Sequence, residues 1–277
     1  MTKKQKVFLN KMISFILGWA FSMVVLIPFA VILVNSFKNQ RESASMSLRL
    51  PKEGWFISNY SVVIDEGNMF RAFLNSTLIA GMCVVFCIMF SAMAAFIIHR
   101  RKNKFHSFVF YLFFAGLIAP VNYITTLQIL KFFHLSGTYI GIIIVNVAMG
   151  IPFATFLIYN FMANIPVELD EASIIDGAGT GKLFFLVVFP LLKPITITAA
   201  TLTFISCWND FMTPLYLLNS SKKWGMILSV YNYWGFLSQD WAKICAVIVL
   251  TLLPILILYI CMQKYIIAGM TSGAVKG

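Results

Sequence analysis

The chain has 277 residues, of which 60% are hydrophobic and 11% are charged. Soluble proteins carry about 25% charged residues, and a soluble domain of this size could not bury so much apolar surface. The formal net charge of +11 comes without a basic stripe of interleaved aromatic residues, so the sequence does not suggest nucleic-acid binding. The composition therefore excludes an ordinary soluble domain and indicates a membrane protein.

Long uncharged runs predict transmembrane helices, because about 20 mostly apolar residues span a bilayer as a helix. Each run is too long and too continuously apolar for the alternating strands, roughly 10 residues each, of a membrane β-barrel. We expect an all-α, polytopic membrane protein with six transmembrane helices. The expected spans are residues 12–35, 73–98, 107–130, 138–162, 193–218 and 243–263.

The first span follows a lysine-rich stretch and so could be mistaken for a secretory signal. Its apolar core exceeds the usual length of about 7–15 residues, and no convincing small-x-small cleavage site follows it. We therefore expect an uncleaved membrane anchor.

Basic residues near the ends of the spans indicate their orientation. Four lysines precede the first span, and Arg100, Arg101, Lys102 and Lys104 lie between the second and third spans. With both segments inside, six spans place both termini in the cytoplasm. This assignment leaves nine Lys and Arg residues outside against twelve inside, so it rests on the greater density of the inner clusters.

The segment between the fourth and fifth spans, from Glu168 to Pro190, holds four of the ten acidic residues. Pro166 suits the first position of a helix, and three acids crowd the first turn, where the helix dipole favours each anion by about 0.3–1 kcal/mol. Gly177 and Gly179 predict the end of this helix, because glycine accepts the left-handed conformation that closes helices. Thr180 can cap a second short helix.

Two short helices are thus expected on the cytoplasmic membrane surface. Leu169, Ala172 and Ile175 fall on one side of the first helix, so we expect them to face the bundle while the acids face the cytosol. Two interpretations remain open: an interfacial linker with solvated acids, or a docking element for a cytosolic partner with a basic groove. Acids beside an anionic inner leaflet are unusual in a simple linker.

The same segment resembles a known motif. Glu171-Ala172-Ser173, Asp176-Gly177-Ala178 and Pro190 match the EAA motif, E-A-A-x-x-D-G-A with a downstream hydrophobic-x-x-P, of permease subunits of binding-protein-dependent ABC importers. Ser173 stands where the motif usually has Ala, a small-for-small change. Trp208-Asn209-Asp210-Phe211 and the ending from Gly269 to Gly277 further resemble carbohydrate permeases similar to the G subunit of the maltose transporter.

The resemblance implies partners in a bacterial cytoplasmic membrane: a second homologous permease, two cytosolic ABC ATPase subunits and an extracytoplasmic solute-binding protein. ATP and Mg would bind to the ATPases, so we expect no cofactor in this chain. The first short helix would dock in an ATPase cleft, and the C-terminal tail would reach between the ATPases. The expected docking residues are Glu168, Leu169, Glu171, Ala172, Ile175, Asp176, Gly177 and Ala178.

The sequence does not indicate chemistry in the chain itself. Gly177 to Lys182 reads GAGTGK, but Leu183 follows the lysine where a phosphate loop needs Ser or Thr. The three histidines lie apart, and the five cysteines fall in the expected spans without metal-ligand spacing. We expect no catalytic residue and no metal site, and we assign ATP hydrolysis to another chain.

Polar residues within the expected spans are candidates for a substrate path. Asp210 is the only acid in a span, where a charge at mid-bilayer costs at least ~2.5–3.5 kcal/mol on insertion scales. Helix packing is the alternative role for each of these residues. The candidates are Asn122, Tyr123, Thr126, Trp208, Asn209 and Asp210.

The expected function is that of a permease subunit of an ABC importer, carrying a carbohydrate inward by alternating access. One alternative is a permease for a non-sugar solute. Another is an integral membrane hydrolase that uses Asp210 with the histidines, although His99 and His106 fall on the inner side and Asp210 nearer the outer side. The expected organisation is one transmembrane domain over 1–277, with a core at 72–264, an external loop at 36–71, a coupling loop at 164–190 and a tail at 265–277.

Overall fold

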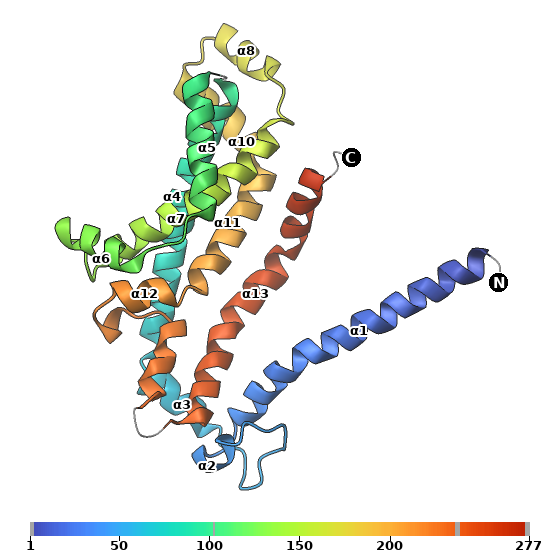
Figure 1. Cartoon of the computed structure of the whole chain (residues 1–277), viewed down its shortest axis with the longest axis vertical. Coiled ribbons are helices and arrows are strands. Elements are labelled where there is room, and N and C mark those ends of the chain that lie inside the picture. Colours follow the sequence, from blue (N-terminus) through green and yellow to red (C-terminus); the bar gives the residue numbers. More distant parts are fainter. Residues whose placement is uncertain (1–2, 102, 236–238, 275–277) are drawn as a thin grey trace. The chain divides into compact units, whose positions relative to one another are not determined.

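The chain folds into helices, and the computed structural model describes residues 3–101, 103–235 and 239–274, with side chains within residues 11–263. Within these ranges, strand-like pairing amounts to a single bridge between Trp234 and Gln239. Figure 1 labels the helices in chain order. They are α1 (Lys3–Asn35), α2 (Gln40–Ser43), α3 (Ser58–Asp65), α4 (Met69–Arg100), α5 (Lys104–Ile118), α6 (Tyr123–Phe132), α7 (Tyr139–Met162), α8 (Glu168–Ile175), α9 (Thr180–Lys182), the π-helix η1 (Leu183–Val188), α10 (Phe189–Leu191), α11 (Lys193–Trp208), α12 (Met212–Leu217), the 3-10 helices η2 (Ser221–Lys223) and η3 (Ile227–Tyr233), and α13 (Trp241–Ala274).

Membrane-crossing helices account for most of the described chain. Four helices are long and apolar enough to span a bilayer by themselves, and two bent helix pairs pass the same criterion together. If each bent pair counts as one span, the total of six agrees with the number expected from the sequence. The four single spans are Lys11–Asn35, Met69–Arg100, Tyr139–Met162 and Trp241–Gln263.

The third span is not the continuous helix that the sequence suggested over 107–130. Helix α5 ends at Ile118, α6 begins at Tyr123, and the two meet at an angle of 119°. Pro120 lies between them, and a proline has no N–H to donate to the preceding turn. Asn122 then starts the new helix, because its Oδ1 accepts the backbone N–H of Thr125 at 3.1 Å.

The fifth span also ends earlier than expected. Helix α11 stops at Trp208 instead of running to residue 218, and a separate short helix, α12, starts at Met212. Asp210 lies between them, and its Oδ1 accepts the N–H of Thr213 at 3.0 Å, in the manner of a helix-capping residue. At its other end α11 meets the segment Thr180–Leu191 at a bend of 78°.

The chain divides into two compact units, each built from separate stretches. The first comprises Met1–Met69 with Ser229–Leu253, and the second Phe70–Leu228 with Pro254–Gly277. The single domain over 1–277 stays a prediction. Of the expected tail at 265–277, the backbone continues helix α13 to Ala274, and residues 275–277 lie outside the described residues.

In the first unit, the segment after α1 is organised around a buried lysine. Lys38 is 2% exposed, and its Nζ donates to Asn35 Oδ1 at 2.8 Å and to the Ser47 carbonyl at 2.7 Å. Burial lowers the pKa of Lys38, while the charge of Glu42 acts in the opposite direction. Asn59 Nδ2 in turn donates to the Lys38 carbonyl at 2.8 Å. The expected external loop is therefore an ordered structure.

In the second unit, small residues let α4, α7 and α11 pack closely. Cys87 on α4, Ala154 on α7 and Ala199 on α11 belong to one buried cluster. Cys87 is a free, buried thiol, in agreement with a packing role. Aromatic contacts join α5 to α7, among them Phe110 with Tyr159 at 4.5 Å between ring centroids.

The first turn of α7 gives a test of this packing. A Cβ on Gly141 would lie 2.3 Å from the Leu135 carbonyl oxygen, which is backbone and cannot easily yield. We expect Gly141→Ala to destabilise the purified protein by about 1–3 kcal/mol, the usual cost of overpacking. Gly81, with nothing within 4 Å of its Cβ position, is the control: Gly81→Ala should leave the thermal midpoint unchanged or raise it. Equal midpoints for the two variants would contradict this packing.

Candidate functional site

Helix α8 forms where the sequence predicts it, with acids at its start and a glycine at its end. Glu168, Asp170 and Glu171 occupy the first turn. Gly177 has a φ of +81°, the left-handed conformation that glycine tolerates, and the next N–H, of Ala178, donates to the Ser173 carbonyl at 2.9 Å. The helix–turn pattern of the acidic segment is thus confirmed.

The orientation of α8 differs from the expected one, although Glu168 and Glu171 are exposed as expected. Leu169 is 40% exposed and Ile175 84% exposed, so the apolar side of the helix does not face the bundle. Instead the carboxylate of Asp170 turns inward, and this residue is 7% exposed. The reason is a charged partner that lies far away in the sequence, Arg100 at the end of α4.

Arg100 and Asp170 form an ion pair with both oxygens engaged. Arg100 Nε lies 2.7 Å from Asp170 Oδ2, and Nη2 lies 3.3 Å from Oδ1. The guanidinium also donates to the Ile165 carbonyl from Nη1 at 3.3 Å and from Nη2 at 3.2 Å. Removing one member of a buried pair costs about 3–5 kcal/mol, because the other charge is left unpaired. The pair therefore joins the inner side of α8 to the end of α4.

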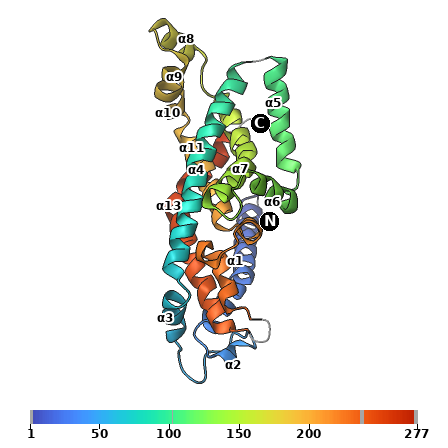
Figure 2. The ribbon, with the colours of Figure 1, turned by 90° about the vertical axis from the view of Figure 1, so that its left-hand side faces the viewer.

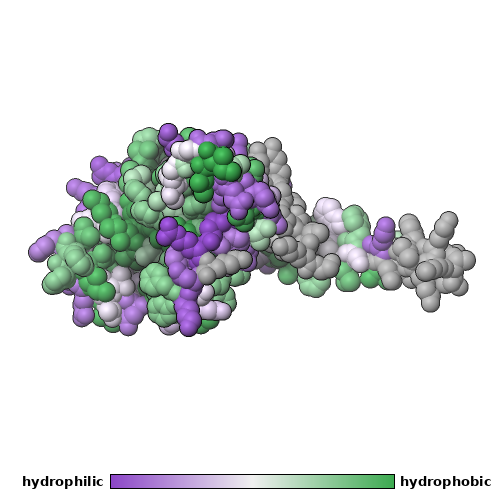
Figure 3. All heavy atoms as spheres, turned by 90° about the horizontal axis from the view of Figure 1, so that it is seen from above, coloured by the Kyte–Doolittle hydropathy of each residue, from purple (hydrophilic) through white to green (hydrophobic). Residues whose placement is uncertain are grey.

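The expected docking residues lie together on the outer side of α8 and its following turn. All are exposed except Ala178, which is half-buried, and Ile174 adds a further apolar side chain at 59% exposure. Ile174 was not in the expected docking set. Looking onto the α8 end, Figure 3 shows hydrophilic and hydrophobic residues side by side on the surface.

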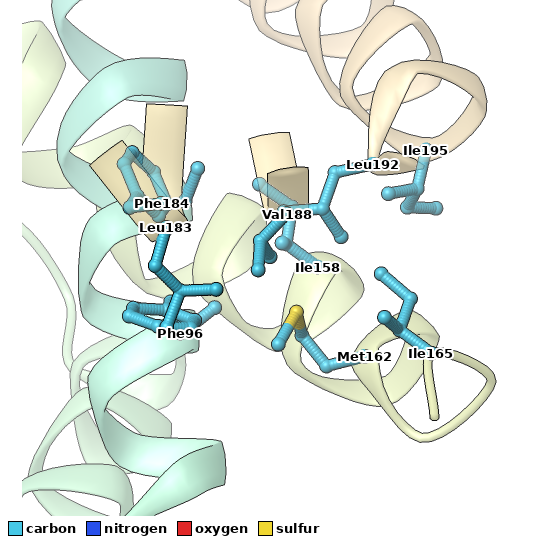
Figure 4. Close-up of a cluster of buried hydrophobic side chains, with 11 residues drawn as sticks. Phe96, Ile158, Met162, Ile165, Leu183, Phe184, Val188, Leu192 and Ile195 are labelled. Carbon is cyan, nitrogen blue, oxygen red and sulfur yellow. The ribbon is translucent and has the colours of Figure 1, made fainter. Parts of the chain in front are cut away.

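The chain after α8 returns to the bundle through an apolar cluster. Leu183, Phe184 and Val188 of the π-helix η1 are buried against Phe96 of α4 and Ile158 of α7, as Figure 4 shows. A π-helical turn is rare and is frequently found at functional sites. Because η1 is buried in this cluster, the segment from α8 to α10 forms an arm that is anchored near the point where it joins α11 (Figure 2).

The expected substrate-path residues fall into three groups. Asn122 and Thr126 make local contacts at the start of α6, where Thr126 Oγ1 donates to the Asn122 carbonyl at 2.8 Å. Tyr123 stacks on Tyr216 of α12 at 5.0 Å between ring centroids. Trp208 is buried against Phe73 and Phe204, and Asn209 is exposed at the end of α11.

Asp210 belongs instead to the lining of a cavity of about 540 Å³ between α7 and α11, in which polar side chains stand among apolar ones. Its Oδ2 is buried and has no hydrogen-bond partner among the described residues. Each helix contributes residues at spacings i, i+3, i+4 and i+7, which form one helical face. These residues are Asn146, Met149, Gly150 and Phe153 on α7, and Thr203, Ser206 and Cys207 on α11, followed by Asp210 just after the end of that helix; Leu202 completes the lining.

Sequence reasoning missed most of this cavity, although the spacing was readable. Asn146, Thr203 and Ser206 were not among the expected substrate-path residues. Their common face with Asp210 was the available signal.

Charged and metal-binding chemistry elsewhere is sparse. Among residues whose placement is described, no three His, Cys, Asp or Glu side chains lie close enough to hold a metal ion. His99 packs against the Tyr159 ring at 5.1 Å, at the end of α4 that carries Arg100, whereas Asp210 follows the opposite end of α11. This separation argues against a hydrolase built from Asp210 and His99.

Membrane-crossing helices, an exposed helix anchored at one end and a cavity between two of the helices agree with a multi-pass membrane transport protein. Residues 6–272 match the family described as binding-protein-dependent transport system inner membrane component, and the chain belongs to this family. The resemblance to importer permeases inferred from the EAA-like segment is thereby confirmed.

Individual relatives match along almost the whole chain. The melibiose/raffinose/stachyose import permease protein MelC of Bacillus subtilis is 32% identical over 254 residues, covering 91% of each chain. The multiple sugar-binding transport system permease protein MsmG of Streptococcus mutans is 31% identical and covers 100% of both chains. A bacterial ABC transporter involved in alginate import has the same fold, with a TM-score of 0.79, 20% identity and coverage of 96% and 98%.

The break at Asp210 gives a second test. Asp210→Asn keeps an acceptor for the Thr213 N–H, whereas Asp210→Ala removes it. We expect the Ala variant to lose about 0.5–2 kcal/mol of stability, as for other lost helix caps, and the Asn variant to lose little. Thermal unfolding of the purified proteins measures the difference, and equal losses in both variants would rule out the capping role.

Proposed function

We propose that this chain is the transmembrane permease subunit of an ATP-driven importer that carries a carbohydrate inward, as an oligosaccharide, a monosaccharide or a related polyol. Membership of the importer-permease family supports the transport role. The names of the relatives MelC and MsmG, a melibiose/raffinose/stachyose import permease and a multiple sugar-binding transport permease, support a sugar as the substrate. The polar cavity between α7 and α11 offers hydroxyl, amide and carboxylate groups, which suit a polyhydroxylated solute.

The outer side of α8 is the proposed docking surface for a partner ATPase. The observation that carries this proposal is the exposure of Leu169, Ile174 and Ile175 beside the acids Glu168 and Glu171. Full burial of one isoleucine is worth about 1.5–3 kcal/mol. An exposed ion pair contributes only ~0–1 kcal/mol, so the apolar side chains should supply most of the docking energy and the acids its specificity.

The remaining partners follow from the same proposal. A second, homologous permease would complete the pore, and two ATPase subunits would bind and hydrolyse ATP with Mg, leaving no cofactor in this chain. The segment 36–71 would lie outside and contact a solute-binding protein. With α8 in the cytosol, both termini would lie on the cytosolic side of a bacterial cytoplasmic membrane.

Closure of the two ATPases on ATP would move α8 and open the cavity to the outside. Reopening of the ATPases would open the cavity to the cytosol. Nucleotide can drive this change only through contacts that differ between the two states. The cavity between α7 and α11 would then belong to the substrate path, with Asp210 as its charged residue.

Docking is tested on the outer side of α8. Ile175→Ala and Glu171→Lys should weaken co-purification of the ATPase and reduce uptake, because they remove an apolar anchor and reverse a charge. Ile124→Ala, at a 71% exposed isoleucine on α6, is the control and should change neither. Unchanged co-purification and uptake in both α8 variants would overturn the docking proposal.

The cavity is tested by filling it. Ser206→Phe should reduce uptake about tenfold or more, equivalent to 1.4 kcal/mol or more, while the complex still assembles. Ser206→Ala keeps the space and should transport near the wild-type level. If Ser206→Phe transports normally, the cavity lies outside the substrate path.

The substrate class is tested with the intact complex and its binding protein. We expect a carbohydrate to stimulate ATP turnover by the reconstituted complex. Stimulation by a non-sugar solute alone would contradict the substrate assignment and leave the importer function standing.

A further inference from the structure

We infer that Arg100 is a positioning residue for coupling: it links α8 to the end of α4, so that a movement of α8 is passed on to the membrane helices. The inference rests on the proposed docking function of α8. It concerns the inner side of that helix, opposite the residues that would touch the ATPase.

The position of Arg100 suits such a link. It is the last residue of α4, a helix that runs from Met69 through the whole span. A cation is favoured at the C-terminal end of a helix, where the carbonyl groups point outward. Its side chain is 11% exposed and that of Asp170 is 9% exposed, so water competes little for the contact.

One guanidinium joins α4 to three residues, two in the connection between α7 and α8 and one in α8 itself. It holds the Asp170 carboxylate through two nitrogens, the Ile165 carbonyl through two contacts and the Pro166 carbonyl at 3.5 Å. Ile165 and Pro166 belong to the short connection between α7 and α8. Only an arginine has enough planar N–H donors for this set, since a lysine ammonium is a single point with three.

The link is confined to the first turn of α8, and a separate contact holds the other end of the arm. There, Leu183 and Phe184 pack against Phe96, one turn before Arg100 on the same helix α4. The segment that carries the docking surface thus contacts the end of α4 twice, through Arg100 at the start of α8 and through Phe96 at η1. These two contacts give a movement of the segment a direct physical route to α4.

The neighbouring residue provides a matched control. Arg101 has the same side chain and follows Arg100 directly, but it is exposed. A general loss of positive charge at this end of the bundle would affect both arginines alike. A coupling role predicts a difference between them.

The test uses the full complex reconstituted with its ATPases and binding protein, comparing Arg100→Gln, Asp170→Asn and Arg101→Gln. Three quantities are measured: co-purification of the ATPases, ATP turnover with and without loaded binding protein, and uptake. We expect Arg100→Gln and Asp170→Asn to keep the ATPases bound but to reduce substrate carried per ATP hydrolysed by about tenfold, within the usual range of coupling between sites. Arg101→Gln should match the wild type.

Rescue separates a positioning role from a merely structural one. The double variant Arg100→Asp with Asp170→Arg restores opposite charges, and we expect it to recover part of the lost coupling. Arg100→Lys, which keeps the charge without the planar fork, should fall between the wild type and Arg100→Gln. If Arg100→Gln does not fold, Asp170→Asn, which keeps the side-chain shape, and the double variant still give the measurement.

The possible failures are distinguishable. Loss of ATPase co-purification in Arg100→Gln or Asp170→Asn, equal losses in Arg101→Gln, or no recovery in the double variant would overturn the coupling role of Arg100. The docking proposal would fail separately, through intact ATPase binding in the Ile175→Ala and Glu171→Lys variants.

Discussion

A lipid bilayer offers no water to backbone groups, so every N–H and C=O within it must be bonded inside the protein. This constraint makes the chain helical, and it also decides where helices can stop. The breaks after Ile118 and Trp208 are each followed by a polar side chain, Asn122 and Asp210, whose oxygen accepts an N–H of the next helix. At these two helix breaks the sequence therefore supplies a side-chain oxygen that accepts the hydrogen bond of a backbone N–H.

The same constraint explains why residues that looked like a substrate path have different roles. At Asn122 and Thr126 the polar groups are used locally, to start a helix after a proline. Asp210 uses only one of its oxygens in this way and lines the cavity opposite Asn146 of α7. A polar side chain within the membrane therefore indicates a functional site only after its hydrogen bonds to backbone groups have been accounted for.

Much of the architecture could be predicted from the sequence, because long apolar runs, glycine and first-turn acids act locally. The number of spans and the bounds of α8 belong to this class. The direction in which α8 faces could not be predicted in this way, because Asp170 is paired with Arg100, 70 residues earlier in the chain. A helix with acids on one side and apolar residues on the other is ambiguous when either side can be buried. The bend at Pro120 was equally hidden, since prolines also occur in unbroken transmembrane helices.

The ion pair between Arg100 and Asp170 bears on how interchangeable such loops are between related permeases. A graft of the acidic segment alone would bring Asp170 to a scaffold that need not hold a cation at the end of its second span, and the buried carboxylate would then be unmatched. The unit that can be exchanged is the loop together with the last turn of α4. Moving the proposed docking surface of this chain to another permease would therefore require two separate stretches of sequence, the loop and the end of α4.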